Sequence, residues 1–178
     1  MALSVLLGGA RSGKSAHALQ RGLEHQGPVC FIATANAGDE EMAARIARHR
    51  AERPRRWQTI EEPLHLDSAL AGAGEEALVI VDCLTLWLSN QLAGGAADED
   101  VLQSAEAAAR RAAARVAPVI AVSNELGMGI VPGDRLTRRF RDLHGQMNAT
   151  WVAHADDASL LVAGALLALA RVPASELG

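Results

Sequence analysis

A glycine-rich segment near the N-terminus carries the residue types that bind phosphate. Residues 8–15 match the pattern G-x-x-x-x-G-K-[ST] at every defined position. In such a loop the backbone N–H groups surround phosphate oxygens, and the lysine reaches the β- and γ-phosphates of a bound nucleotide. The hydroxyl of the closing serine is suited to ligate Mg²⁺. The sequence therefore predicts nucleotide contacts from Gly8, Gly9, Ala10, Arg11, Ser12, Gly13, Lys14 and Ser15, with Mg²⁺ on Ser15.

Lys14 is the only lysine among seventeen basic residues; all the others are arginines. A lysine that persists in such a sequence indicates a task for which a planar guanidinium is unsuited, and a compact ammonium among phosphates is such a task. The alternative, an ordinary glycine turn between a strand and a helix, leaves this lysine unexplained. The same count argues against a regulatory GTPase, because an Asn-Lys-x-Asp guanine-binding segment needs a second lysine.

Asp82 is the candidate partner of the phosphate loop. It follows the apolar run Leu-Val-Ile-Val at 78–81, which predicts a buried strand. The carboxyl ends of strands form the ligand-binding edge of an open α/β sheet. Asp82 is therefore expected to hold Mg²⁺, directly or through water. The alternative is a helix cap for a segment beginning at Thr85.

A histidine on a basic helix is the candidate nucleophile. The segment 38–53 is predicted to be an amphipathic helix, on which His49 shares a stripe with Ile46 and Arg53, and Arg45 lies one turn before it. Neighbouring guanidinium groups disfavour the imidazolium form and favour a neutral, nucleophilic ring. The same arginines are suited to bind phosphates. The alternative is a half-buried histidine at the edge of an apolar stripe.

Short apolar runs alternate with helical stretches along the chain. This order predicts an α/β fold with a mostly parallel sheet and helices on both faces. No linker interrupts it, so residues 1–178 are expected to form a single nucleotide-binding domain with a loose end at about 171–178. The expected strands are 3–7, 28–35, 57–61, 77–83, 118–123 and 159–163, and the expected helices are 14–25, 38–53, 63–70, 85–92, 97–116 and 134–155.

Composition and charge exclude several classes of protein. Of the 178 residues 49% are hydrophobic and 21% charged, which excludes a disordered chain. A net charge of −4 argues against a general nucleic-acid binder, including a helicase or recombinase. No apolar run approaches the roughly 20 residues of a membrane span. Cys30 and Cys83 have neither disulfide-framework nor zinc-site spacing, so reduced thiols in the cytoplasm are expected.

Six motifs taken together resemble one enzyme family. They are Gly-Gly-Ala-Arg-Ser-Gly-Lys-Ser (8–15), Ile-Ala-Thr-Ala (32–35), Glu-Met-Ala-Ala-Arg-Ile-x-x-His-Arg (41–50), Arg-Pro-x-x-Trp-x-Thr-x-Glu (53–61), Val-Asp-Cys-Leu-Thr-Leu-Trp-Leu-Ser-Asn (81–90) and Ser-Asn-Glu-Leu-Gly-Met-Gly-Ile-Val-Pro (123–132). The sequence resembles the bifunctional adenosylcobinamide kinase / adenosylcobinamide-phosphate guanylyltransferases of cobalamin biosynthesis. The likeness runs from residue 3 to about 163, and its motifs are more specific than the phosphate loop alone.

The resemblance implies a RecA-like P-loop fold, a homotrimer and two reactions. The first phosphorylates the aminopropanol hydroxyl of adenosylcobinamide, with ATP or GTP as the donor. The second transfers GMP from GTP through a histidine, and gives adenosylcobinamide-GDP and pyrophosphate. The matching histidine is His49. Some family members carry a His-His pair at this place, whereas this chain has Arg48-His49 and therefore offers only one imidazole there.

The resemblance also implies nucleotide contacts beyond the loop. The positions that match the family are Ala33, Thr34, Ala35, Arg50, Ala51, Glu52, Arg53, Glu61 and Asp82.

Two other functions stay open on the sequence alone. A simple P-loop small-molecule kinase needs no nucleophilic histidine, and a nucleotide-dependent regulatory module would transfer nothing.

The segment Ser123-Asn124-Glu125 ends a strand at the expected ligand edge, and Gly127 and Gly129 after it permit a lid. An ordinary strand-to-helix turn explains that segment equally well.

Overall fold

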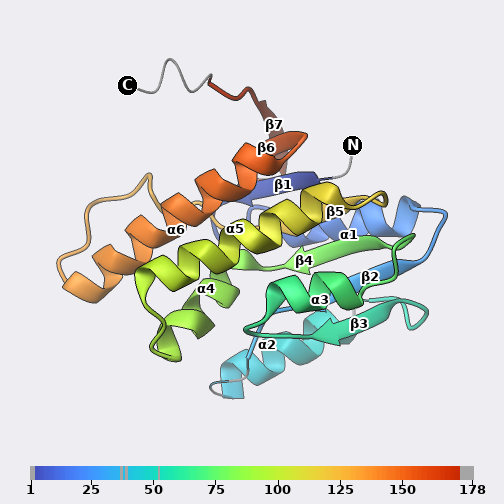
Figure 1. Ribbon diagram of the computed structural model, residues 1–178, viewed down its shortest axis with the longest axis horizontal. Coiled ribbons are helices and arrows are strands. Elements are labelled where there is room, and N and C mark those ends of the chain that lie inside the picture. Colours follow the sequence, from blue (N-terminus) through green and yellow to red (C-terminus); the bar gives the residue numbers. More distant parts are fainter. Residues whose placement is uncertain (1–2, 37, 39, 52, 173–178) are drawn as a thin grey trace.

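The computed structural model describes residues 3–36, 38, 40–51 and 53–172 (Figure 1). Within them one seven-stranded sheet has the order β3-β2-β4-β5-β1-β6-β7. The strands are β1 (Leu3–Gly8), β2 (Val29–Ala33), β3 (Gln58–Glu61), β4 (Leu78–Asp82), β5 (Val119–Val122), β6 (Asp157–Val162) and β7 (Ala165–Leu169). The helices are α1 (Lys14–Glu24), α2 (Glu40–Ala51), α3 (Leu66–Gly72), α4 (Leu84–Ala93), α5 (Asp98–Ala114) and α6 (Arg135–His154).

The first six strands pair in parallel, which confirms the predicted mostly parallel sheet. All of β1, β2 and β5 is buried. Parallel strands covered on both faces are apolar at successive positions, which is why these runs were recognisable in the sequence. The carboxyl ends of β1, β4 and β5 therefore lie side by side at one edge of the sheet.

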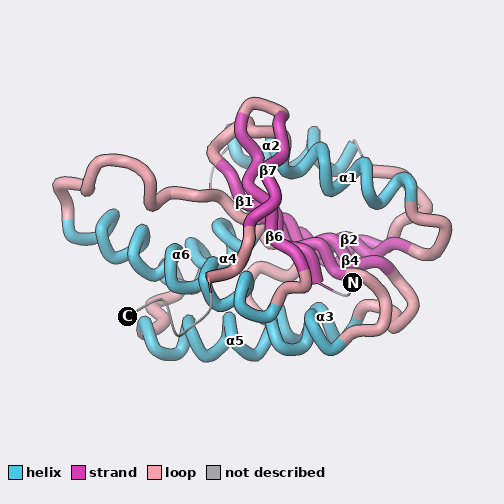
Figure 2. Tube along the Cα trace, turned by 90° about the horizontal axis from the view of Figure 1, so that it is seen from above, coloured by secondary structure: helices cyan, strands magenta, loops and turns pink. Residues whose placement is uncertain are grey.

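Alternate side chains of each strand pack against different helices. The larger cluster joins Val5, Val79 and Val119 to α3, α4, α5 and α6, whereas the smaller one joins Leu6 and Ile80 to α1. Figures 1 and 2 show the same division, with α1 and α2 on one side of the sheet and the other four helices on the opposite side. This three-layer arrangement confirms helices on both faces.

The seventh strand is missing from the sequence prediction. β7 pairs antiparallel with β6, and a two-residue turn of Ala163 (φ 50°) and Gly164 (φ 83°) joins them. A tight hairpin turn with two positive φ values is usually marked by Asn-Gly or Asp-Gly, and alanine gives no such signal. The preceding strand also begins at Asp157, two residues before the predicted start.

The third helix begins later than predicted. A helix was expected from Pro63, but α3 begins at Leu66. The carboxylate of Glu62 accepts hydrogen bonds from the backbone N–H groups of Leu64 (3.0 Å) and His65 (2.9 Å), and so holds this segment in a turn. A side chain that binds its own following backbone competes with the helix there.

Two further expectations concern the chain as a whole. The single domain of residues 1–178 stays a prediction, and most of the expected loose end, 173–178, lies outside the described residues. In the described ranges, no helix combines the length and the hydropathy required to cross a bilayer.

Gly22 in α1 is a close-packing position. A Cβ atom there would lie 2.6 Å from the indole of Trp57 and 2.9 Å from Cδ1 of Ile80, and both side chains are buried. Gly145, in the long helix α6, is exposed and has open space around its Cβ position. The two glycines therefore share a helical backbone conformation but differ in how closely other side chains approach them.

We expect Gly22→Ala to lower the free energy of unfolding by about 1–3 kcal/mol, because the methyl group overpacks the α1–sheet interface. Gly145→Ala is the matched control and should raise it by about 0.5–1 kcal/mol through helix propensity. Urea denaturation of the two variants checks the pair. Equal stabilisation of both would show that the core accommodates a methyl group at position 22.

Candidate active site

The loop between β1 and α1 is shaped by two glycines. At Gly8 (φ 153°) a Cβ atom would lie 2.3 Å from the carbonyl oxygen of Leu161 in β6, a distance no side chain tolerates. Gly13, the N-cap of α1, has φ 102°, in the left-handed region that glycine adopts freely. These two positions let the backbone turn tightly, as a loop that surrounds phosphate requires.

Lys14 is 7% exposed and lies across the loop that precedes it. Its ammonium donates to the carbonyl oxygens of Gly8 (2.9 Å) and Gly9 (2.8 Å), and lies 3.4 Å from the hydroxyl of Ser12. A buried ammonium needs such partners because desolvation is costly. The contacts hold the charge beside the loop amides, where a polyphosphate would lie.

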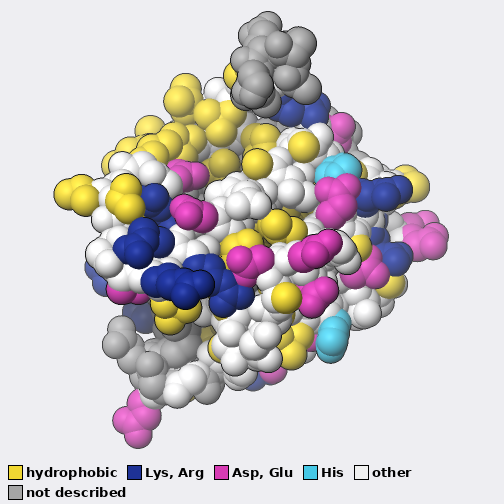
Figure 3. Space-filling model, turned by 60° about the vertical axis from the view of Figure 1, so that its left-hand side comes forward, with side chains coloured by type: hydrophobic (Ala, Val, Ile, Leu, Met, Phe, Trp, Pro, Cys, Tyr) yellow, Lys and Arg dark blue, Asp and Glu magenta, His cyan; other side chains and the backbone are white. Residues whose placement is uncertain are grey.

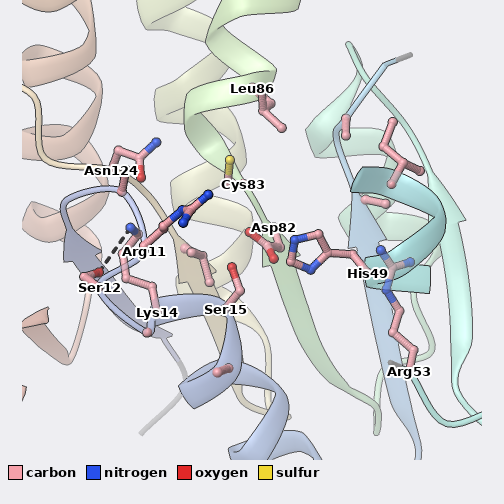
Figure 4. Close-up of a pocket in the computed structure, with 17 residues that line it drawn as sticks. Arg11, Ser12, Lys14, Ser15, His49, Arg53, Asp82, Cys83, Leu86 and Asn124 are labelled. Atoms are coloured by element: carbon pink, nitrogen blue, oxygen red, sulfur yellow. Dashed lines mark hydrogen bonds between the residues drawn. The ribbon is translucent and has the colours of Figure 1, made fainter. Parts of the chain in front are cut away.

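Asp82 ends β4 opposite this loop. The hydroxyl of Ser15, the second residue of α1, points toward its carboxylate (Figure 4). The helix-cap alternative is wrong, since α4 has Cys83 as its N-cap and no side chain caps it. The two predicted metal ligands are therefore neighbours.

Burial raises the pKa of Asp82 above its ordinary value. The hydrogen bond from Ser15 opposes this shift, as do, in decreasing order, the charges of His49, Arg53 and Lys14. The permanent charges of Arg53 and Lys14 stabilise this carboxylate, and a divalent ion would stabilise it further.

A cavity of about 420 Å³ joins the loop, Asp82 and the basic helix. Figure 4 shows the imidazole of His49 pointing toward the carboxylate of Asp82, with Ser15 beneath and the guanidinium of Arg11 reaching in from the loop. Arg53 lies beside His49, and its guanidinium stacks 3.8 Å above the ring of Phe31. Of the predicted site residues, those that line this cavity are Ala10, Arg11, Ser12, Gly13, Lys14, Ser15, Ala33, Ala35, His49, Arg53 and Asp82.

The remaining predicted residues lie outside the lining. Thr34 is fully buried, and its hydroxyl both donates to the carbonyl of Cys83 (2.7 Å) and accepts from its N–H (2.8 Å), so it supports the chain just after Asp82. Arg50 forms an exposed ion pair with Glu61 (2.8 Å). Gly8, Gly9 and Ala51 are also outside the lining, and Glu52 lies outside the described residues.

Six lining residues were not predicted as site residues. Cys83, Leu86 and Asn124 are labelled in Figure 4, and the others are Ala16, Ile46 and Val122. Burial and the nearby charge of Asp82 raise the pKa of Cys83 to about 12, so its thiol stays protonated and is no nucleophile. The position of Asn124 directly after an apolar strand was the available signal for a lining residue.

The donors at the Ser15–Asp82 contact fit Mg²⁺. A hydroxyl and a carboxylate are hard oxygen ligands, and Mg²⁺ commonly combines one or two of them with substrate phosphates and water. Across the described ranges, no three His, Cys, Asp or Glu side chains gather as a complete protein cage. The arrangement thus suits an ion that arrives with a nucleotide.

Three relatives and one family description match this chain. The family model "Cobinamide kinase / cobinamide phosphate guanyltransferase" (CobU) matches residues 4–169. The chain is 41% identical over 172 residues to the "Bifunctional adenosylcobalamin biosynthesis protein CobP" of Pseudomonas aeruginosa, covering 95% of this chain and 98% of that protein. It is 40% identical to each protein of the same description named CobU from Escherichia coli (strain K12) and Salmonella typhimurium, covering 90% of this chain and 95% of each.

A solved structure shares the fold. It is described as a prototypical ATPase from the type III secretion system of pathogenic bacteria, and superposes with a TM-score of 0.54 at 14% identity. The match covers 90% of this chain and 51% of that one, so this chain spans about half of that ATPase. The likeness confirms the predicted P-loop fold and shows the fold alone.

A buried polar network lies behind the cavity wall. His144 in α6 is 1% exposed, stacks on Phe140, and lies with Nε2 3.0 Å from the hydroxyl of Thr85 and 3.4 Å from that of Ser123. Burial lowers the pKa of His144 from 6.5 to about 4. The imidazole is therefore neutral near pH 7.

The low pKa of His144 predicts acid destabilisation. Between pH 6.5 and 4 the unfolded chain binds a proton at this histidine that the folded protein does not, so stability present above pH 6.5 is lost as the pH falls. The loss should approach about 3 kcal/mol near pH 4. Urea denaturation of wild type and His144→Gln at pH 7 and 4.5 isolates it, because other groups titrate alike in both. Parallel losses in the two proteins would contradict the assignment.

Proposed function

Because this chain belongs to the cobinamide kinase / cobinamide phosphate guanyltransferase family, we propose that it phosphorylates adenosylcobinamide and then transfers GMP to the product. The family assignment confirms the resemblance seen in the six motifs. The observation that carries the proposal is the convergence of Lys14, Asp82 and His49 on one cavity. A kinase needs the first two of these residues, whereas a covalent nucleotidyl transfer also needs the third.

The kinase step uses the phosphate loop. The aminopropanol hydroxyl of the corrinoid attacks the γ-phosphorus of ATP or GTP, the bond from that phosphorus to the β-bridging oxygen breaks, and the nucleoside diphosphate leaves. The ammonium of Lys14 and the loop N–H groups stabilise the charge on the β- and γ-phosphates. The hydroxyl proton passes to solvent or to a phosphate oxygen.

The guanylyl step uses the opposite wall of the cavity. A ring nitrogen of His49 attacks the α-phosphorus of GTP, the bond to the α,β-bridging oxygen breaks, and pyrophosphate leaves. A phosphate oxygen of adenosylcobinamide phosphate then attacks the same phosphorus and releases the imidazole. Arg53, held on the ring of Phe31 beside His49, is placed to stabilise the α-phosphate.

We assign Mg²⁺ to Ser15 and Asp82. The ion would supply charge neutralisation of the polyphosphate and Lewis-acid polarisation. The other proposed nucleotide contacts are those implied by the family likeness, Ala33, Thr34, Ala35, Arg50, Ala51, Glu52 and Glu61. Thr34 would then act through its hydrogen bonds to the backbone of Cys83, and the Arg50–Glu61 pair would act from outside the lining.

A homotrimer in the cytoplasm completes the proposal. The β6–β7 hairpin exposes Val162, Leu166, Leu167 and Leu169, and Figure 3 shows hydrophobic side chains gathered on one part of the surface. Contiguous exposed apolar surface is typical of a subunit interface. The two cysteines are free thiols, as a reducing compartment allows.

His49→Ala separates the two reactions. We expect GTP labelled at the α-phosphate to leave GMP on the wild-type protein as an acid-labile, alkali-stable phosphoramidate, and the variant to remain unlabelled and inactive in guanylyl transfer. Adenosylcobinamide kinase activity should stay measurable, because that step needs no imidazole. His65→Ala, an exposed histidine outside the cavity, is the control and should label normally. Label on His49→Ala, or on a peptide lacking residue 49, would refute the covalent route.

Asp82→Asn tests the metal assignment. The substitution keeps the shape of the side chain and removes its charge, so the Mg²⁺ concentration for half-maximal nucleotide binding should rise about tenfold or more and both transfers should slow. Asp142→Asn, an exposed acid on α6, is the matched control. An unchanged Mg²⁺ requirement in Asp82→Asn, measured by titration calorimetry, would remove Asp82 from the site.

A further inference from the structure

Asn124 lies between the two halves of the phosphate site. β5 is flanked by β4, which carries Asp82, and by β1, which leads into the phosphate loop. Just after β5, the N–H of Ser123 donates to Leu6 (2.9 Å), and that of Glu125 donates to Gly8 (2.9 Å). The same Gly8 carbonyl accepts the ammonium of Lys14. The residue directly after Asn124 is therefore bonded to the carbonyl that anchors the lysine.

The backbone of Asn124 is held from both sides by side chains. Its N–H donates to the hydroxyl of Thr85 in α4 (2.9 Å), and its carbonyl accepts from Nδ2 of Asn148 in α6 (2.9 Å). Both main-chain polar groups of Asn124 are thus hydrogen-bonded by side chains of α4 and α6. Such bonds fix the orientation of the residue without involving its own side chain.

The holding groups are themselves buried and connected. Thr85, Ser123, His144 and Asn148 are all buried. The hydroxyl of Ser123 donates to Oδ1 of Asn148 (2.6 Å), and that of Thr85 lies 3.0 Å from His144. Burying this many polar groups is unfavourable unless they are paired, and here they pair around one backbone position. The network therefore surrounds the backbone of Asn124 with paired polar groups.

The carboxamide of Asn124 is the part left for the cavity. Asn124 lines the cavity. The hydrogen bonds to Thr85 and Asn148 use its backbone N–H and carbonyl and leave its side chain out. Figure 4 shows it above the loop, on the side of Ser12 and Lys14 away from His49. A carboxamide there is uncharged and can donate an N–H hydrogen bond to a phosphate oxygen without repelling the ammonium of Lys14.

We propose that the carboxamide of Asn124 binds the terminal phosphate of the nucleoside triphosphate, and that Thr85 and Asn148 are positioning residues that aim it. The inference rests on the proposed function. The loop N–H groups and Lys14 follow the end of β1, and the metal ligand Asp82 ends β4. The end of β5 lies between these two strand ends and would face the terminal phosphate. A diphosphate would leave this contact unmade.

The discrimination between triphosphate and diphosphate tests the proposal. We would measure Mg²⁺-dependent binding of α,β-methylene-GTP and α,β-methylene-GDP by titration calorimetry, since neither analogue can guanylylate His49. Asn124→Ala should weaken the triphosphate about tenfold or more, as expected for one hydrogen bond to a charged group, and leave diphosphate affinity unchanged. A merely structural role would weaken both ligands alike and keep their ratio.

Conservative variants separate the contact from its support. Asn124→Asp keeps the shape and the backbone bonds but places an anion beside the phosphate, so it should lose more triphosphate affinity than Asn124→Ala. Thr85→Ser should retain the wild-type ratio, whereas Thr85→Val, which lacks the hydroxyl, should lose part of it. An unchanged ratio in Asn124→Ala overturns the inference alone, and failure of wild type to bind either analogue overturns the proposed function as well.

Discussion

The carbonyl group of Gly8 is the point on which the site depends. It ends β1, accepts the N–H of Glu125 beyond β5, and accepts the ammonium of Lys14. The same residue passes so close to Leu161 of β6 that no Cβ atom fits. One backbone position therefore aligns three neighbouring strands and the only lysine. Because the strands are parallel, that alignment also sets where Asp82 and Asn124 face the loop.

The balance of charge in the cavity would allow the two proposed transfers to share one polyphosphate site. Asp82 is buried, and the Ser15 hydroxyl and three basic groups offset the cost of its charge. His49 reaches this carboxylate from α2, on the wall opposite the loop. In the proposed function, a triphosphate laid between the walls would present its terminal phosphate to the loop and its α-phosphate to His49. Attack at the γ-phosphorus by the acceptor hydroxyl would release the nucleoside diphosphate, whereas attack at the α-phosphorus by His49 would release pyrophosphate.

Much of the fold and part of the site followed from local sequence. Strands buried on both faces are apolar throughout, and the phosphate loop and Asp82 each follow such a run, so their neighbourhood could be inferred. β7 could not, because Ala163-Gly164 turns the chain without the residues that usually mark a hairpin. Asn124 and Leu86 reach the cavity through strand order and helix placement, which depend on contacts between distant segments. Arg50 and Glu61 were expected from the family pattern, and the structure pairs them with each other outside the lining.

The burial of Lys14 has a consequence for the chemistry of the whole surface. Since this chain has no other lysine and Lys14 is 7% exposed, the exterior presents no lysine amine. Acylation, methylation and the attachment of modifier proteins through lysine thus have no side-chain acceptor on the exterior. Amine-reactive reagents that reach a lysine can do so only inside the phosphate loop, where a bound polyphosphate would shield it. Covalent labelling of lysine in this protein is accordingly a direct report on occupancy of that loop.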